Sequence, residues 1–328
     1  MNHRNFIVVI FTITGVIVGL FVMNSIFAKE KAEKENHEQE EIMRLTSPYF
    51  PESLTFCDQP LPLEELHVRE ALDRELTQNA YFHSHIILNL KRAYRYFPII
   101  DSILKAHNMP GDLKYLCVAE SNLTQVVSPA KAAGFWQFIE STGKNYGLEI
   151  KKDVDERFHI EKSTEAACKY LRFLYRKFNN NWFLAAAAYN MGEAGLQKAL
   201  DLQQENEYWD LWLNQETSRY VYRILSYKLI FENPKKYHFY LYKTDLYPPL
   251  NDKEIVVNTS IPSLFQFAAA QNISYRALKE RNYWLRDTAL LVQGKSYRIK
   301  IPADDKKTYT THLKSENNPF VIFEGFKP

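Results

Sequence analysis

Residues 110–122 read PGDLKYLCVAESN and predict a short helix whose first turn holds a proline and an aspartate. The apolar stripe of this helix passes through Leu113, Leu116 and Cys117, and Glu120 occupies the next position on the same face. Burial disfavours the charged form of a carboxylate and raises its pKa, so an acid at a core position stays protonated near neutral pH. Glu120 is therefore the candidate catalytic acid, unless it is a helix-end glutamate that reaches solvent or pairs with an arginine.

A segment rich in small and aromatic residues follows at 128–147 (SPAKAAGFWQFIESTGKNYG). Its small residues, up to Gly134, allow backbones to approach closely. The aromatic run that starts at Phe135 predicts a second helix, which ends near Gly147. Gln137 is a polar amide among these rings. Because buried polar groups need partners, a ligand amide or hydroxyl group could bind to it.

Apolar stripes of helical period predict further helices on both sides of this region. A long helical pattern runs from about 62 to 107, and we expect Pro98 to break it. Ser163 is expected to cap another helix. Two more helices are predicted over 182–190, which holds four consecutive alanines, and over 216–231. The expected fold class is mainly α, and the low count of ten glycines also favours helices over tight turns.

Four motifs in this order resemble those of lytic transglycosylases of the goose-type-lysozyme-like superfamily. They are Glu120 with Ser121, residues 134–137 (GFWQ), residues 188–190 (AYN), and Tyr220 within residues 216–221 (ETSRYV). The similarity extends over about 60–235. Glu120 and Gly134 are one residue closer together than is common in that family, so Ser128 matches the family's serine only if the loop has lost a residue. The resemblance implies a lysozyme-like helical catalytic domain, which we place at 46–245.

The resemblance also implies a reaction that uses a single carboxylic acid. Glu120 would protonate the glycosidic oxygen between N-acetylmuramic acid and N-acetylglucosamine in peptidoglycan. It would then remove the proton of the muramoyl C6 hydroxyl, which closes a 1,6-anhydro ring without consuming water. The residues expected to bind the sugar are Ser121, Ser128, Gln137, Tyr189, Asn190 and Tyr220. No metal and no organic cofactor is implied.

Other carboxylates near these motifs are weaker candidates for a second catalytic group. The structural roles expected for them are an ion pair or turn for Asp155 and Glu156 beside Arg157, a solvent-facing position for Glu140, and a first-turn position for Glu193. Glu216 is the best of the second candidates, because it opens the helix that bears Tyr220. If such a group positioned water, the outcome would be hydrolysis. A hydrolytic muramidase therefore stays open, as does an inert peptidoglycan-binding scaffold.

Residues 254–302 predict a separate module with the order strand, helix, helix, strand. This order resembles a divergent LysM domain, which implies binding to glycans that contain N-acetylglucosamine. Thr259 and Ser260 stand where a Gly-Asp turn is usual, so a structural appendage that no longer binds glycan is the alternative. The remaining residues, 303–328, are expected to form a tail.

The N-terminus predicts an exported protein. Residues 6–28 contain no charged side chain and are long enough to span a bilayer as a helix. We interpret 1–28 as an uncleaved anchor, with a cleaved signal peptide as the alternative, and 29–45 as a charged spacer. Either interpretation places the rest of the chain in the cell envelope, in the periplasm and anchored in the inner membrane, or secreted after cleavage.

The composition excludes several other classes of protein. Forty-one basic and 39 acidic residues give a net charge of +2, which argues against a protein built around nucleic-acid binding. Three cysteines, Cys57, Cys117 and Cys168, leave at least one unpaired within the chain and form no CxxC metal pair. We expect Cys117 and Cys168 to act as small hydrophobic residues in helices.

Overall fold

The computed structural model describes residues 23, 24, 27, 46–303 and 322–326. The chain divides into two compact units after Ser47, and the elements described here belong to the second unit. The predicted anchor or signal segment 1–28 therefore lies mostly outside the described residues, as do the spacer 29–45 and most of the tail 303–328. None of the helices in the described part of the chain is both long and apolar enough to cross a membrane.

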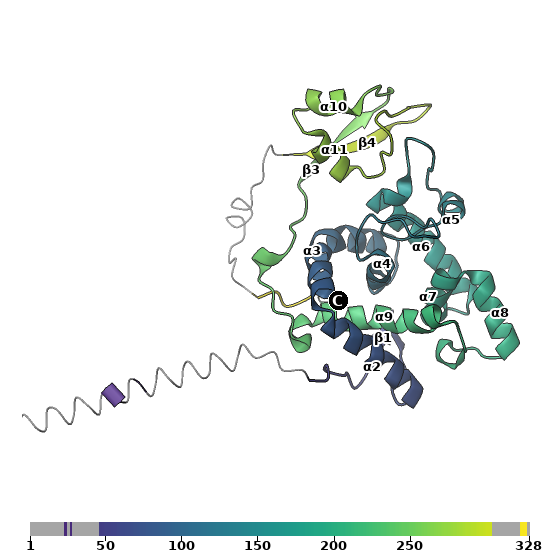
Figure 1. Ribbon diagram of the computed structural model, residues 1–328. Coiled ribbons are helices and arrows are strands. Elements are labelled where there is room, and N and C mark those ends of the chain that lie inside the picture. The colour runs from purple at the N-terminus through teal and green to yellow at the C-terminus, as the bar shows by residue number, and fades with distance from the viewer. Residues whose placement is uncertain (1–22, 25–26, 28–45, 304–321, 327–328) are drawn as a thin grey trace, which may run out of the picture. The chain divides into compact units, whose positions relative to one another are not determined.

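Helices form most of the second unit, which confirms the expected mainly α fold class (Figure 1). A short antiparallel hairpin of β1 (Thr55–Phe56) and β2 (Gln59–Pro60) precedes them. The helices that follow are α2 (Leu66–Tyr81), α3 (His83–Ala106), α4 (Leu113–Ser121), α5 (Glu140–Asn145), α6 (Ile160–Lys177), α7 (Trp182–Met191), α8 (Glu193–Gln203) and α9 (Gln215–Glu232). The 3-10 helices are η1 (Glu156–Phe158), η2 (Tyr208–Asp210), η3 (Pro234–Tyr237) and η4 (Lys243–Asp245).

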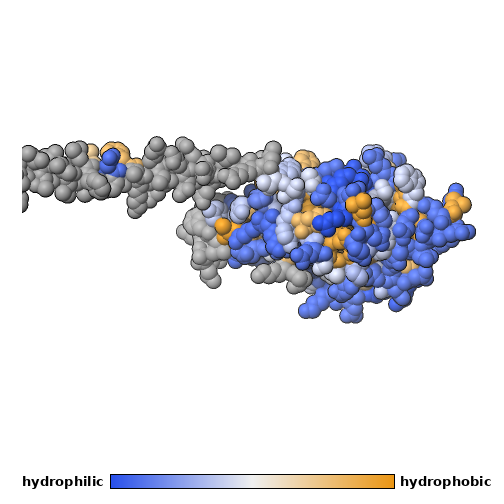
Figure 2. Space-filling model, turned by 90° about the horizontal axis from the view of Figure 1, so that it is seen from below, coloured by the Kyte–Doolittle hydropathy of each residue, from blue (hydrophilic) through white to orange (hydrophobic). Residues whose placement is uncertain are grey.

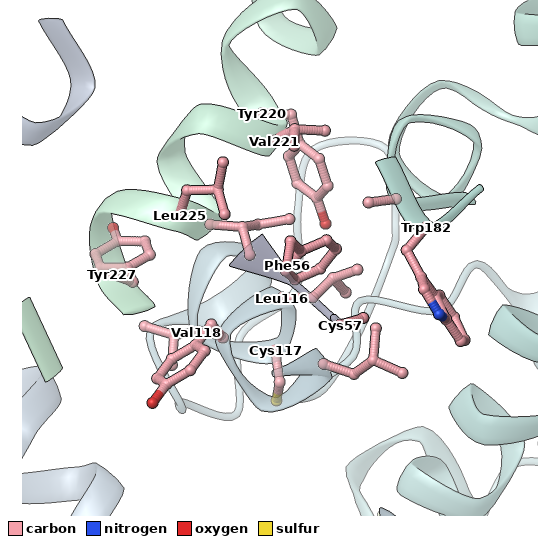
Figure 3. Close-up of a cluster of buried hydrophobic side chains, with 14 of the residues drawn as sticks. Phe56, Cys57, Leu116, Cys117, Val118, Trp182, Tyr220, Val221, Leu225 and Tyr227 are labelled. Atoms are coloured by element: carbon pink, nitrogen blue, oxygen red, sulfur yellow. The ribbon is translucent and has the colours of Figure 1, made fainter. Parts of the chain in front are cut away.

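Helix α4 lies in the middle of the helical region and packs against α3 and α9 (Figure 1). The predicted stripe is confirmed, because Leu113, Leu116 and Cys117 are fully buried. Figure 3 shows Leu116 and Cys117 in one buried cluster with Tyr220 of α9. Truncation of a buried leucine to alanine costs about 2–5 kcal/mol. Packing of this strength fixes the helical turn that carries Glu120.

The interruption expected at Pro98 is wrong, because α3 continues through it to Ala106. A proline inside a helix removes a backbone hydrogen bond and costs about 3 kcal/mol or more. Phe97 and Ile100 flank the proline and are almost fully buried. The packing of α3 against the core therefore outweighs the cost of the proline.

The helix expected to start at Phe135 is wrong in its starting point. Residues 126–138, called the site loop from here on, form turns, and α5 begins only after them. Gly134 and Gln137 have φ values of 77° and 47°, which a right-handed helix cannot contain. Backbone hydrogen bonds across the loop, such as the one from Gly134 N to Val126 O at 3.0 Å, replace helical ones.

The cap expected at Ser163 is also wrong, because α6 begins earlier, at Ile160. Ser163 is fully buried inside the helix, and its hydroxyl donates to the carbonyl oxygen of Ile160 at 3.3 Å. Serine inside a helix makes such bonds to the preceding turn. The preference of serine for caps is therefore overridden by burial here.

The C-terminal module has the predicted order of strand, helix, helix and strand. Its elements are β3 (Asp252–Val257), α10 (Leu264–Ala270), α11 (Tyr275–Arg281) and β4 (Tyr297–Pro302). The strands pair antiparallel, with Asp252 opposite Pro302 and Val257 opposite Tyr297. This small sheet, covered by two short helices, confirms the predicted βααβ arrangement.

The hydrophobic core of the module is completed by side chains of the helical region. Ala133, Val154 and Phe158 are buried in the same cluster as the inward-facing residues of the module. Backbone hydrogen bonds of 2.9 and 2.8 Å join residues 153–155 to residues 284–286. The module is therefore packed directly on the segment that borders the site loop.

One face of the surface is mostly hydrophilic, with hydrophobic residues in small patches among hydrophilic ones (Figure 2). Scattered exposed apolar side chains are normal on folded proteins. An exposed large apolar side chain therefore indicates a binding surface only where further contacts fix its position.

Candidate active site

Glu120 lies in the last turn of α4, and its side chain is half-buried. The hydroxyl of Tyr220, which comes from α9, donates a hydrogen bond to Glu120 Oε1. Tyr220 itself is only 2% exposed. The helix C-terminus directly behind Glu120 is closed by Asn122 in the left-handed conformation, with a φ of 54°. The packing of α4 on α9 thus brings together two residues that the sequence separates widely.

Burial raises the pKa of the Glu120 carboxyl from 4.5 to about 7. The hydrogen bond from Tyr220 opposes this rise, because it stabilises the carboxylate form. The carboxylate of Glu216 adds to the rise, and the positive charge of Arg223 opposes it. Near neutral pH both forms of Glu120 are therefore populated, so the same group can give a proton and take one back.

Tyr189 is held by the site loop. Its hydroxyl donates to the carbonyl oxygen of Trp136 at 2.7 Å, and its ring lies 5.3 Å from that of Tyr170 and 6.1 Å from that of Phe138. Burial and the charge of Glu120 raise the pKa of Tyr189 well above its usual value. Tyr189 is thus a neutral phenol near the candidate acid, with its position fixed by the loop backbone.

Asn190 is held by the first turn of α9. Its Nδ2 donates to Glu216 Oε1 at 3.3 Å, and its Oδ1 accepts a bond from the Thr217 hydroxyl at 2.8 Å. The side chain of Asn214 caps α9 by accepting from Thr217 N at 3.0 Å. Sequence reasoning missed Thr217, although the Asn-x-x-Thr pattern at this helix start was available as a signal.

Ser121 and Ser128 use their hydroxyls in local structure. Ser121 is 2% exposed, and its Oγ donates back to Cys117 O at 3.3 Å within α4. Ser128 Oγ accepts from Ala132 N at 3.1 Å and closes a turn of the site loop. The Ser121 hydroxyl therefore donates within α4, and the Ser128 oxygen accepts a bond within the site loop.

Gln137 braces the site loop from within. Its Nε2 donates to Gly134 O at 2.7 Å and to Val126 O at 3.1 Å. A Cβ on Gly134 would lie 1.9 Å from Arg157 O, so the loop packs against that backbone closely enough to require glycine. The predicted close approach of backbones is confirmed at this residue.

Arg157 holds the outer side of the site loop. Its guanidinium donates to Lys131 O at 2.9 Å and to Phe138 O at 3.1 Å, and it pairs with Asp155 at 2.7 Å. The predicted ion pair beside Arg157 is confirmed. Its contacts with the loop were not anticipated, because they join distant parts of the sequence.

The alternative carboxylates are placed largely as expected. Glu140 is exposed and forms an i,i+4 pair with Lys144 at 2.6 Å, and Glu193 lies in the first turn of α8. Glu156 is buried and accepts from Glu149 N at 2.8 Å. Among these carboxylates, Glu216 is the one whose charge adds to the raised pKa of Glu120.

A buried carboxylate on α2 was missed by sequence reasoning. Glu75 is 2% exposed, and Arg219 Nε donates to it at 2.6 Å. Arg223, one turn further along α9, lies 3.9 Å from the same carboxylate. Glu75 therefore binds the arginine whose charge acts on Glu120. The sequence of α2 did not indicate this role of Glu75, because Arg219 and Arg223 lie far away in the sequence.

Within the described residues, one group of acidic and histidine side chains is close enough to share a metal ion. Its members are Glu65, His67 and Asp210, and the last two are exposed. The group includes neither Glu120 nor Tyr220, which donates a hydrogen bond to Glu120.

Two segments of the chain match known domain families. Residues 97–212 match the model of the family described as "Transglycosylase SLT domain". Residues 253–305 match that of the "Soluble lytic transglycosylase C-terminal LysM-like domain". The chain therefore carries an SLT transglycosylase domain followed by a LysM-like domain, which confirms the resemblance seen in the sequence. The bounds placed at 46–245 and 254–302 stay predictions.

Two curated relatives are named membrane-bound lytic murein transglycosylase D, from Escherichia coli strains K12 and O6:H1. Each is 33% identical to this chain over 245 residues, which cover 73% of this chain and 52% of the relative. The chain thus spans about half the length of the curated relatives it matches. Among solved structures, the 70 kDa soluble lytic transglycosylase from Escherichia coli aligns with a TM-score of 0.37 and 19% identity, over 48% of this chain and 28% of that one.

Proposed function

We propose that this protein is a peptidoglycan lytic transglycosylase. It cleaves the β-1,4 bond between N-acetylmuramic acid and N-acetylglucosamine and leaves a 1,6-anhydromuramoyl end. The observation that carries the proposal is the carboxyl of Glu120, with a pKa raised to about 7 and bonded to Tyr220, inside an SLT domain. The name of the curated relatives describes the same class of activity.

In the first step the protonated Glu120 donates its proton to the glycosidic oxygen, and the bond from that oxygen to C1 of the muramoyl unit breaks. The Glu120 carboxylate that results is stabilised by the hydrogen bond from Tyr220. In the second step this carboxylate removes the proton of the C6 hydroxyl, and O6 bonds to C1. Glu120 regains its proton, so the cycle closes without a water molecule.

Tyr189, Asn190 and Gln137 are proposed to bind the sugar around Glu120. Tyr189 presents a phenol near Glu120, fixed by its bond to Trp136 O. Asn190 presents an amide that is bonded to Glu216, whose charge acts on Glu120. Gln137 donates two hydrogen bonds through Nε2, so its amide carbonyl oxygen is the group suited to accept from a sugar. Ser121 and Ser128 would act indirectly, by holding α4 and the site loop.

A hydrolytic muramidase is the second candidate. The observation that favours it is Glu216, an exposed carboxylate that is bonded to Asn190 and acts on the pKa of Glu120. A carboxylate in that position could activate a water molecule for attack on C1. The products would then carry a reducing muramoyl end in place of the anhydro ring.

We further propose that the enzyme works on peptidoglycan strands in the cell envelope. The uncharged segment 6–28 supports an inner-membrane anchor or a cleaved signal, followed by a periplasmic catalytic domain. The relatives are named as membrane-bound proteins. The LysM-like domain would add binding to N-acetylglucosamine units.

Mass spectrometry of purified peptidoglycan sacculi digested with the protein tests these assignments. A lytic transglycosylase yields anhydromuropeptides, and a muramidase yields products heavier by one water. Sacculi that stay intact would indicate a binding scaffold without activity. The Glu120→Gln variant is the control that separates this activity from that of a contaminating enzyme.

A further inference from the structure

Trp212 has the largest exposed fraction, 90%, of the large hydrophobic side chains in the described residues. It lies in the segment between η2 and α9. On either side of it, Leu211 is buried and Leu213 is half-buried, so the segment is anchored to the core at both flanks. An indole ring normally contributes a large area to packing. Here that area faces solvent while its neighbours face the protein.

The backbone of Trp212 is held rigidly although its side chain is free of the core. Gln203, the last residue of α8, accepts a bond from Trp212 N at 2.7 Å and donates one to Trp212 O at 3.1 Å. Both backbone polar groups of Trp212 are therefore tied to one side chain. A ligand that covers this ring therefore does not also have to order the backbone that carries it.

Trp212 is also close to the candidate site along the chain. Glu216, which bonds to Asn190, is four residues further on, so the two Cα atoms are at most about 14 Å apart. The helix that begins at this point carries Tyr220, which binds Glu120. A polymer bound across Glu120 that extends toward the start of α9 would approach the exposed ring.

We propose that Trp212 is a stacking platform for a sugar ring of the glycan strand, at a position remote from the cleaved bond. The inference rests on the proposed function. The C–H groups on one face of a pyranose ring pack well against an indole, and such a contact needs no charged partner. The platform would hold long strands and would leave the shortest substrates unaffected.

A membrane surface is the other occupant that an exposed tryptophan suits. The acidic residues near Trp212 in the sequence disfavour a membrane surface. Asp201, Glu205 and Asp210 lie in the stretches of chain that flank Gln203 and Trp212. Because anionic lipid headgroups repel acidic side chains, the surroundings favour an uncharged sugar over the membrane.

The test compares Trp212→Ala with Leu202→Ala in the full-length protein. Leu202 is 73% exposed and immediately precedes Gln203, so it is a matched apolar control without a ring. For Trp212→Ala we expect a KM about tenfold higher on long glycan strands, with kcat and the KM of the shortest cleaved substrate unchanged. Trp212→Phe should restore most of the affinity. Leu202→Ala should behave as the wild-type protein.

An unchanged KM of Trp212→Ala on long strands would overturn the platform. An equal rise in KM for Leu202→Ala would also overturn it. So would a loss of binding to phosphatidylglycerol vesicles that is specific to Trp212→Ala. Co-sedimentation of each variant with sacculi, in a Glu120→Gln background, measures binding without cleavage. If the wild-type protein released no anhydro products while Trp212→Ala still weakened co-sedimentation, the proposed reaction would fail and the platform would stand.

Discussion

Two regions supply the candidate site, and they are stabilised in different ways. The helices α4, α7 and α9 pack into one continuous core, and they carry Glu120, Asn190 and Tyr220. The site loop carries Gln137 in a series of turns, and it is held by contacts from Arg157. The helical region thus owes its geometry to periodic packing, whereas the loop depends on a few long-range hydrogen bonds.

The two regions are therefore expected to affect different properties of the candidate site. The helices bring the half-buried acid together with its buried phenol partner, and partial burial sets the protonation of Glu120. The loop holds Tyr189 through Trp136 O, and its residue Ala133 is buried in the core of the LysM-like module. Changes in the helices should therefore alter proton transfer, and changes in the loop should alter positioning and stability together.

The largest effect is expected for Glu120→Gln. General acid catalysis contributes about 10²–10⁴-fold to a rate, so we expect kcat to fall about 10³-fold while binding to sacculi is kept. Release of soluble muropeptides measures the change. Glu140→Gln, which alters an exposed carboxylate paired with Lys144, is the matched control and should retain full activity. Near-wild-type turnover by Glu120→Gln would exclude it as the acid.

Gly134→Ala should have the next largest effect, through the site loop. The new Cβ would meet Arg157 O at 1.9 Å, at a residue whose φ is 77°, so the loop must shift. A misplacement of about 1 Å can cost about 10²-fold in rate, and we expect a loss of that order with a lower Tm. Gly111→Ala has no atom within 4 Å of its Cβ and should leave both unchanged. Equal rates and equal Tm values for Gly134→Ala and Gly111→Ala would contradict the described loop packing.

Tyr220→Phe should have a smaller effect that depends on pH. The Tyr220 hydrogen bond favours the carboxylate form of Glu120, so its removal should raise the pKa of Glu120 further above about 7. The basic limb of the pH–rate profile should then move to higher pH. The maximal rate should fall about tenfold, because a bond to a charged group contributes about 1.5–3 kcal/mol. A profile that stays in place or moves to lower pH would contradict this role.

Trp284→Ala should have the smallest effect on rate, and it tests the support from the module. Trp284 is 3% exposed, and its ring lies 5.6 Å from that of Tyr297. Truncation of such a residue costs about 3–5 kcal/mol, so thermal unfolding should occur at a lower temperature. We expect turnover of short substrates to fall about threefold because the border of the site loop loosens. Tyr283→Ala, at a half-exposed neighbour, is the control. An unchanged rate for Trp284→Ala would show that the loop is independent of the module.

The same contrast explains what could be predicted from the sequence. The stripe of α4, the run of alanines in α7 and the pattern of α9 depend on local periodicity, and the structure confirms all three. The βααβ order of the module was predicted for the same reason. Local pattern was therefore sufficient wherever a helix or strand buries one regular face.

The errors and omissions arose where distant contacts decide. Pro98 stays inside α3 because flanking residues are buried, and Phe135 lies in a turn because the site loop is bonded to itself. Glu75 and Arg157 act on residues far away in the sequence. Periodicity carries no information about such partners. The roles of Ser121 and Ser128 in sugar binding come from motif resemblance and stay predictions.

The most direct measurement is a titration of the Glu120 side-chain carboxyl by carbon-13 NMR, with Glu120→Gln used to assign its resonance. A lone acid that gives a proton and takes it back requires a titration midpoint near 7, and Tyr220→Phe should move that midpoint upward. A midpoint at the ordinary value of 4.5 would leave Glu120 ionised at neutral pH and would contradict the proposed mechanism.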